Sequence, residues 1–307
     1  METDDGHRNS HRIKDLIRGS IAKWNEINAP RLAAALSFYS MLSIAPLLVI
    51  SIAIAGMVFG EQAARGQIVW QIEELVGREG GQAIQSMIEH ARRPGASLVA
   101  GTIGILTLFF GASGVFVELR NSLNLIWEAH PPERSGWKAM VHERFTAFAM
   151  VVGIGFLLMV SLLANAAIAA AGNFFAAFLP LPEAILQLIN VLISFGGITL
   201  AFALLYKVVP DASIEWRDVW IGAAVTAALF SIGKFLIGLY IGRAALGSAY
   251  GAAGSLVIFL VWVYYSAQVF FLGAEFTRVF ADRYGSHAQG ARAAGEAPAH
   301  GAHPRPA

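Results

Sequence analysis

The sequence contains no cysteine, little charge, and no excess of charge of either sign. Without cysteine, disulfide bonds, thiolate metal sites and cysteine nucleophiles are excluded. Charged residues make up 14% of the 307 residues and hydrophobic residues 56%, a balance that a soluble domain of this length does not have. Because the chain has 22 basic and 21 acidic residues, it has no large excess of positive charge with which to bind nucleic acid. The composition therefore predicts a membrane protein with no nucleic-acid partner.

Apolar stretches long enough to cross a bilayer recur along the chain. A transmembrane helix needs about 20 apolar residues, and residues 32–59, 98–118, 145–172, 184–206, 219–241 and 254–276 meet this condition. The first stretch is longer than the apolar core of a cleaved signal peptide, ~7–15 residues, so it is predicted to be a retained anchor. The predicted fold class is all-α, a polytopic membrane protein with six transmembrane helices in a membrane domain of residues 32–277.

Three polar segments complete the predicted domain organisation. Residues 1–31 carry six cations around an apolar stripe, and form a helix either at an anionic headgroup layer or docked on the protein's own cytoplasmic face. Residues 61–97 keep a helical rhythm on either side of Gly80 and Gly81, which predicts a helical hairpin outside the bilayer. Residues 278–307 are rich in glycine, proline and alanine, and are predicted to be a disordered cytoplasmic tail.

The distribution of Lys and Arg beside the spans predicts the orientation of the chain. The N-terminal segment and the second and fourth loops hold most of these cations, whereas the third loop has none. Cytoplasmic loops are the ones enriched in Lys and Arg. Both termini are therefore predicted to be cytoplasmic, and the hairpin of residues 61–97 to be extracytoplasmic.

Lys234 is predicted to lie deep in the fifth span, past the bilayer midplane toward the outside. A charged group at this depth is costly, which makes it a functional candidate by default. One interpretation is structural: the long side chain snorkels outward or bonds to a neighbouring helix. The other is a fixed positive charge that lines a polar cavity and attracts a phosphate or carboxylate headgroup.

Further polar groups in the spans are candidates for a substrate or translocation path. Asn165 in the third span, and Ser266 and Gln268 in the last, are expected to face inward. They form either interhelical hydrogen bonds or part of the same cavity. Glu275 lies at the end of the last span, where it either forms an interfacial ion pair or, if buried among helices, acts as a proton- or cation-coupling site.

Proline and glycine mark candidate structural or gating positions. Pro46 removes a backbone hydrogen bond within the first span, and marks either a gate or a simple bend. Gly247 and Gly251 are spaced i, i+4 ahead of the last span. This spacing suits either close helix packing or a hinge of the kind that transporters use.

Several motifs together resemble the YihY/BrkB family of bacterial inner-membrane proteins, once labelled ribonuclease BN. They are residues 33–39 (AAALSFY), 45–48 (APLL), 119–127 (LRNSLNLIW), 250–255 (YGAAGS), 262–268 (WVYYSAQ) and 273–276 (GAEF). The resemblance covers about residues 20–285. It implies a six-helix protein of the bacterial inner membrane that has no settled biochemical activity and a loose association with envelope integrity and virulence. It supplies no catalytic residues.

Enzyme chemistry finds no support among the residues. The predicted spans contain no Asp and no His, and the sequence has neither a nucleophile elbow nor a Walker-type phosphate loop. We therefore expect no catalytic residue, metal, cofactor or ribonuclease activity. The hypothesis is a transporter or flippase-like carrier of an anionic or amphipathic solute, in contact with membrane lipids. The alternative is a non-transporting scaffold for envelope assembly that uses the hairpin as its contact surface. The sequence predicts no oligomeric state.

Overall fold

The computed structural model describes residues 3–60, 62, 65–66, 68–70, 73, 78–91, 98–129, 145, 183–243 and 253–288. These residues form α-helices, with no strand among them. The helices are α1 (Thr3–Glu26), α2 (Ala29–Phe59), α4 (Arg78–Ala91), α5 (Leu98–Ile126), α7 (Glu183–Val208), α8 (Trp216–Arg243) and α10 (Gly254–Arg283). The prediction of an all-α fold is confirmed for this part of the chain.

Five of the six predicted spans coincide with helices, namely α2, α5, α7, α8 and α10. Their limits agree with the predicted ones within three residues, except that α5 and α10 continue to Ile126 and Arg283. The predicted third span lies outside the described residues apart from Phe145. Pro46 lies within α2, which the structure shows as one helix from Ala29 to Phe59.

Two of the described helices are long and apolar enough to cross a membrane, judged by length and composition. They are Trp216–Ile241 and Gly254–Ala288, with mean hydropathies of 1.8 and 1.9. A shorter apolar helix covers Ser194–Val208. The two long helices correspond to the predicted fifth and sixth spans, and the total of six spans stays a prediction.

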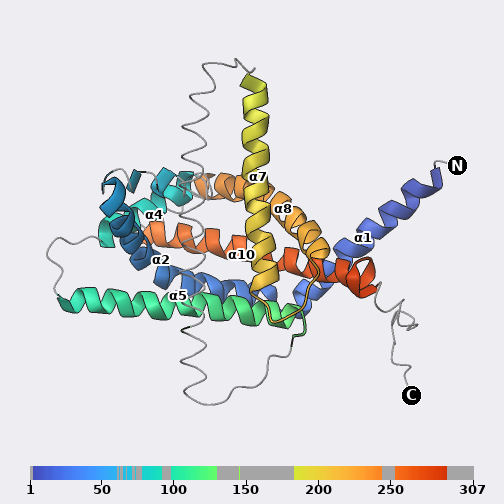
Figure 1. The fold of residues 1–307 in the computed structure, drawn as a ribbon, viewed down its shortest axis with the longest axis horizontal. Coiled ribbons are helices and arrows are strands. Elements are labelled where there is room, and N and C mark those ends of the chain that lie inside the picture. Colours follow the sequence, from blue (N-terminus) through green and yellow to red (C-terminus); the bar gives the residue numbers. More distant parts are fainter. Residues whose placement is uncertain are drawn as a thin grey trace, which may run out of the picture.

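Helix α10 is the centre of the arrangement. It packs against α8, α2, α1 and α4, and α2 packs in turn against α5. In Figure 1, α10 runs between α2 and α8, whereas α7 crosses the other helices and its first half stands clear of them. That half accordingly leaves Val191 and Leu192 exposed. Helices α5 and α10 end, and α8 begins, at the same end of the bundle (Figure 1).

Small residues bring α8 and α10 into close contact along an antiparallel seam. A Cβ atom at Gly273 of α10 would lie 1.9 Å from Thr226 Oγ1 of α8, and one at Gly222 of α8 would lie 1.8 Å from Thr277 Oγ1 of α10. Each glycine thus faces a threonine of the other helix. Both threonine hydroxyls donate to carbonyls of their own helices, at 2.7 Å. The seam therefore joins two helices without leaving these polar atoms unbonded.

Tyr206 attaches α7 to this seam. Its side chain is completely buried, and its hydroxyl donates to the carbonyl of Phe270 at 2.8 Å and lies 3.0 Å from Thr226 Oγ1. The ring also packs against the rings of Phe202 and Phe270. A buried tyrosine with its hydroxyl bonded fixes both the position and the rotation of the helix that carries it.

Helix α4 packs through its apolar face against α2 and α10. Ile84 and Ile88 are buried in a cluster with Leu48, Ile52 and Phe259. The predicted break at Gly80 and Gly81 is wrong, because both glycines lie inside α4. Gly81 serves packing instead of a turn, since a Cβ atom there would lie 2.2 Å from Glu73 Cγ.

The start of the predicted disordered tail is also corrected. Helix α10 continues to Arg283, and a helical turn follows at residues 286–288. Asp218 of α8 holds this turn, because its Oδ2 atom accepts hydrogen bonds from the Ser286 backbone N–H at 3.0 Å and from the Ser286 hydroxyl at 2.7 Å. Composition alone does not reveal this anchor. Residues 289–307 lie outside the described part.

We expect Gly273→Ala to destabilise the protein and Gly196→Ala to leave it unchanged or slightly more stable. The first adds a methyl group against Thr226, and overpacking of this kind costs about 1–3 kcal/mol. A Cβ atom at Gly196 on α7 would meet nothing within 4 Å, and alanine favours the helix. Thermal unfolding in detergent measures both. Equal melting temperatures for the two variants would contradict the seam.

Candidate functional site

Charged side chains gather at the end of the bundle where α1, α5 and α10 end. We call this region the charged end. Arg278 of α10 donates to the carbonyl of Ile126 and forms a 2.6 Å ion pair with Glu128. Lys23 of α1 lies 4.0 Å from the same Glu128 carboxylate. Three helices are thereby joined by charge at one level.

Glu128 occupies an unusual backbone position at the end of α5. Its φ angle is 49°, in the left-handed region that costs a non-glycine residue roughly 1–2 kcal/mol. The turn is closed by a hydrogen bond from the Ala129 N–H to the Asn124 carbonyl, 2.9 Å long. The carboxylate of Glu128 is mostly exposed, at 64%, yet meets Arg278 at 2.6 Å. Ion pairing with Arg278 offsets part of this backbone cost.

A second charged contact closes the α7–α8 connection onto α5. Arg120 binds Asp211 with two hydrogen bonds, of 2.9 and 2.6 Å. The Asn124 side-chain Nδ2 donates to the same carboxylate at 2.8 Å, and its side-chain Oδ1 accepts from the Asp211 backbone N–H at 2.8 Å. The hydrogen bond from Arg120 is the main cause that holds the pKa of Asp211 below its usual value, and Asn124 adds to it.

Glu275 lies buried beneath the charged end, one turn of α10 before Arg278. Its side chain is completely inaccessible to solvent, and neither carboxylate oxygen has a hydrogen-bond partner among the described residues. Arg278 is already committed to Glu128 and the Ile126 carbonyl. The ion pair predicted for Glu275 as one alternative is therefore not formed within the described chain, and the buried alternative fits its surroundings.

Lys234 and Glu275 do not share one site. Helix α10 faces α8 through Trp262, Gly273 and Thr277. At 100° per residue, Gln268 and Glu275 lie on the opposite side of α10. Lys234 lies on α8, directly after Gly233, whose Cβ position meets Tyr265 of α10. It is half-buried and about five turns from the start of α8 at Trp216.

Ser266 and Gln268 have separate local roles. The Ser266 hydroxyl donates to the carbonyl of Trp262 on the preceding turn, at 2.9 Å. The Gln268 backbone carbonyl accepts from Trp24 Nε1 of α1 at 3.4 Å. Gln268 thus lies where α1 covers α10, on the same face as Glu275. Asn165, Gly247 and Gly251 lie outside the described residues, as does the side chain of Pro46.

Sequence reasoning missed the residues that organise the charged end. Asp211 and Asp218 lie outside the predicted spans, where a hydropathy analysis does not single them out. Tyr206 lies at the end of a predicted span, a position typical of an interfacial aromatic residue, yet its side chain is buried. The available signal was the pairing of Arg120 and Asn124 four residues apart on one helical face. Within the described residues, no group of three or more His, Asp or Glu side chains is placed to hold a metal ion.

Comparison with known proteins shows the family. The model of the family described as virulence factor BrkB matches residues 20–298, so the chain belongs to the BrkB virulence factor family. Its relatives carry the description UPF0761 membrane protein, and this chain is a membrane protein. No enzymatic family is indicated.

The relatives are distant and longer. One from Kangiella koreensis is 26% identical over 85% of this chain and 62% of its own length, and one from Ralstonia nicotianae is 27% identical over 87% and 58%. A third, from Tolumonas auensis, is 32% identical over 57% of this chain and 56% of its own length. The chain therefore spans about three fifths of the length of these relatives. No solved structure matches it.

We expect Asp211→Asn to lower the melting temperature at neutral pH but not in acid. Because the pKa of Asp211 is depressed by Arg120, its stabilising contribution is present above the unfolded value, about 3.9, and is lost as the pH falls through the lower folded value. Thermal unfolding in detergent between pH 8 and pH 3 measures the difference from the parent protein. Glu215→Gln, an exposed acid in the same connection, is the control. A difference that persists unchanged at the lowest pH would contradict the assignment.

Proposed function

We propose that the protein is a carrier of an anionic, amphipathic solute, with a phospholipid-like molecule as the substrate class and Glu275 as the site that couples movement to a proton or cation. The observation that carries the proposal is the buried carboxyl group of Glu275, which has no hydrogen-bond partner among the described residues. Ionisable groups buried in membrane helices are costly, and they mark ion pathways and proton relays.

The cost of burying Glu275 argues for a role that changes during function. An isolated carboxylate in an apolar surrounding is far more costly than the neutral acid. A structural role alone is served equally well by leucine, which brings no such cost. A carboxyl group that binds and releases a proton, or meets a cation in another conformation, accounts for a glutamate at this position.

Lys234 supplies the charge expected for an anionic solute. It lies far from the charged end, at a depth where only a few other ionisable groups are expected. Glu275 lies on the side of α10 that faces away from α8 and Lys234. This separation suits a pathway with one site for the solute and another for the coupling ion. In this proposal the chain lies in the bacterial inner membrane with both termini cytoplasmic, because Lys and Arg gather on that side.

The test is the movement of fluorescently labelled phosphatidylglycerol across vesicles that contain the purified protein. Dithionite quenches label in the outer leaflet, so the rate of further loss reports transfer between leaflets. We expect transfer above that of protein-free vesicles, a rate that changes when a pH gradient is imposed, and loss of transfer in Lys234→Met. Glu275→Gln is expected to keep transfer but to lose its response to the gradient.

Matched variants separate these effects from general damage. Arg217→Met removes a cation from an exposed position at the start of α8, and Glu215→Gln removes an exposed carboxylate. Both should behave like the parent protein. The carrier hypothesis would be contradicted by a folded Lys234→Met protein with full lipid transfer, or by a parent protein whose transfer rate does not exceed that of empty vesicles. A normal gradient response in Glu275→Gln would remove Glu275 from the mechanism.

A second function, a non-transporting scaffold for envelope assembly, is favoured by one observation. Trp70, in the segment predicted to lie outside the bilayer, is 55% exposed, and exposed tryptophan is typical of protein contact sites. For a scaffold, Trp70→Ala should weaken cross-linking to envelope proteins in cells, while Lys234→Met leaves it intact. The reverse pattern would contradict the scaffold.

A further inference from the structure

Helix α1 has one face on the protein and one face free of it. Leu16 and Ser20 are buried, and Gly19 between them lies against Val279 and Arg283 of α10, with its Cβ position 3.3 Å from each. Arg283 also donates to the Asp15 carbonyl at 3.1 Å. The second alternative from the sequence, a helix docked on the protein, therefore describes this face.

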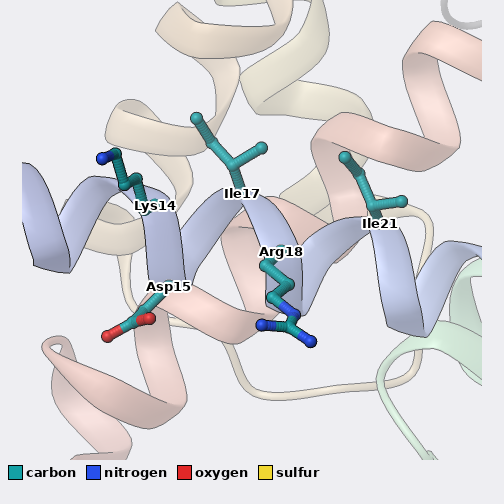
Figure 2. A pocket seen from close by; sticks show the side chains of 5 residues that line it. All are labelled: Lys14, Asp15, Ile17, Arg18 and Ile21. Carbon is teal, nitrogen blue, oxygen red and sulfur yellow. The ribbon is translucent and has the colours of Figure 1, made fainter.

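The outward face carries apolar side chains that the protein leaves uncovered. Ile17 is 50% exposed and Ile21 is 46% exposed. Together with Lys14, Asp15 and Arg18 they line an open depression on the helix surface. Figure 2 shows Ile17 and Ile21 pointing to one side of α1 with Lys14, while Asp15 and Arg18 point away from them. The two isoleucines thus share their side of the helix with one cation, Lys14, and Arg18 lies with Asp15 on the other side.

The isoleucine stripe lies level with exposed tryptophans at the end of the bundle. Residues 15–19 of α1 lie beside the last turn of α10, as the Gly19 and Asp15 contacts show. The first turn of α8 lies at the same level, because Asp218 binds Ser286 just after α10. There Trp216 and Trp220 are 46% and 44% exposed. Exposed tryptophan at a span end is typical of the membrane interface.

We propose that the outward face of α1 binds anionic phospholipid headgroups at the membrane surface. Ile17 and Ile21 insert among the first carbons of the acyl chains, while Lys14, on the same side of α1, binds a lipid phosphate. A cation near an anionic surface is attracted to it, and a helix of this kind lies with its apolar side at the headgroup boundary. The Asp15 carboxylate points to the other side together with Arg18 (Figure 2), so that neither of these two charges lies beside the isoleucines.

Lipid is the occupant that these observations favour over a protein. The apolar stripe consists of two isoleucines, and the charge on its side of the helix, that of Lys14, is positive. A protein interface instead buries a broader apolar centre with a polar rim. The stripe also lies level with the exposed tryptophans of α8. In this way α1 is attached to α10 by one face and to the lipid surface by another, independently of any transport.

The absence of cysteine makes the test direct. Ile21→Cys, labelled with a nitroxide, is compared with a label at Ala22→Cys, an exposed position about one third of a turn further round α1 and away from Ile17. The full protein is placed in nanodiscs of phosphatidylglycerol or of phosphatidylcholine. In phosphatidylglycerol we expect the Ile21 label to gain access to oxygen and lose access to a water-soluble nickel complex, whereas the Ala22 label stays accessible to nickel.

Neutralising Lys14 separates charge from hydrophobicity. In Lys14→Gln the Ile21 label should lose the difference between the two lipids, and added salt should have the same effect on the parent, whereas Arg18→Gln should keep the difference. An Ile21 label that stays water-accessible in phosphatidylglycerol would overturn the proposal, as would protection equal in both lipids and unchanged in Lys14→Gln. Neither outcome depends on lipid transfer, so the carrier hypothesis is tested separately.

Discussion

The contact between α8 and α10 determines the position of almost everything else that the structure describes. Glycine faces threonine twice across this seam, so the two backbones come closer than larger side chains would allow. Tyr206 binds to the seam at Phe270 and Thr226 and brings α7 with it. Because water is not available to backbone and hydroxyl groups in a bilayer, each hydroxyl here is bonded to a carbonyl. The seam is therefore tight, and its threonine and tyrosine hydroxyls are all hydrogen-bonded.

The charged end completes the arrangement by a different kind of interaction. Arg278 joins α10 to the end of α5, and Arg120 joins α5 to the α7–α8 connection. Part of the α5 side of these contacts belongs to residues 119–127, a stretch that carried part of the family resemblance. Arg120 and Asn124 in that stretch bind Asp211, and the carbonyl of Ile126 accepts from Arg278. The motif thus has a physical meaning, which is to connect three helices at one end of the bundle.

Helices were predictable from the sequence, whereas their contacts were not. Long apolar stretches need helical hydrogen bonding in a bilayer, so α8 and α10 appear close to where hydropathy placed them. Which helices pack against each other depends on side-chain shape and on residues far apart in the sequence. The sequence around Gly273 therefore does not indicate that Thr226 would face it. The error at Gly81 has the same origin, because glycine permits close packing as readily as a turn. Burial of Glu275 was likewise an alternative that only packing could decide.

The two faces of α10 differ in a way that limits how the protein can move. The face toward α8 is closely packed, and separating it would break the glycine–threonine contacts and the Tyr206 hydrogen bonds together. The face toward α1 holds Glu275, whose carboxyl group has no hydrogen-bond partner among the described residues. Near Glu275 this face is covered by the 3.4 Å contact between Trp24 Nε1 and the Gln268 carbonyl, and the closer contacts of Gly19 and Asp15 lie further along, at Val279 and Arg283. A conformational change that alters the surroundings of Glu275 therefore costs least on this side. Helix α1, one face on α10 and the other exposed, is the element best placed to make it.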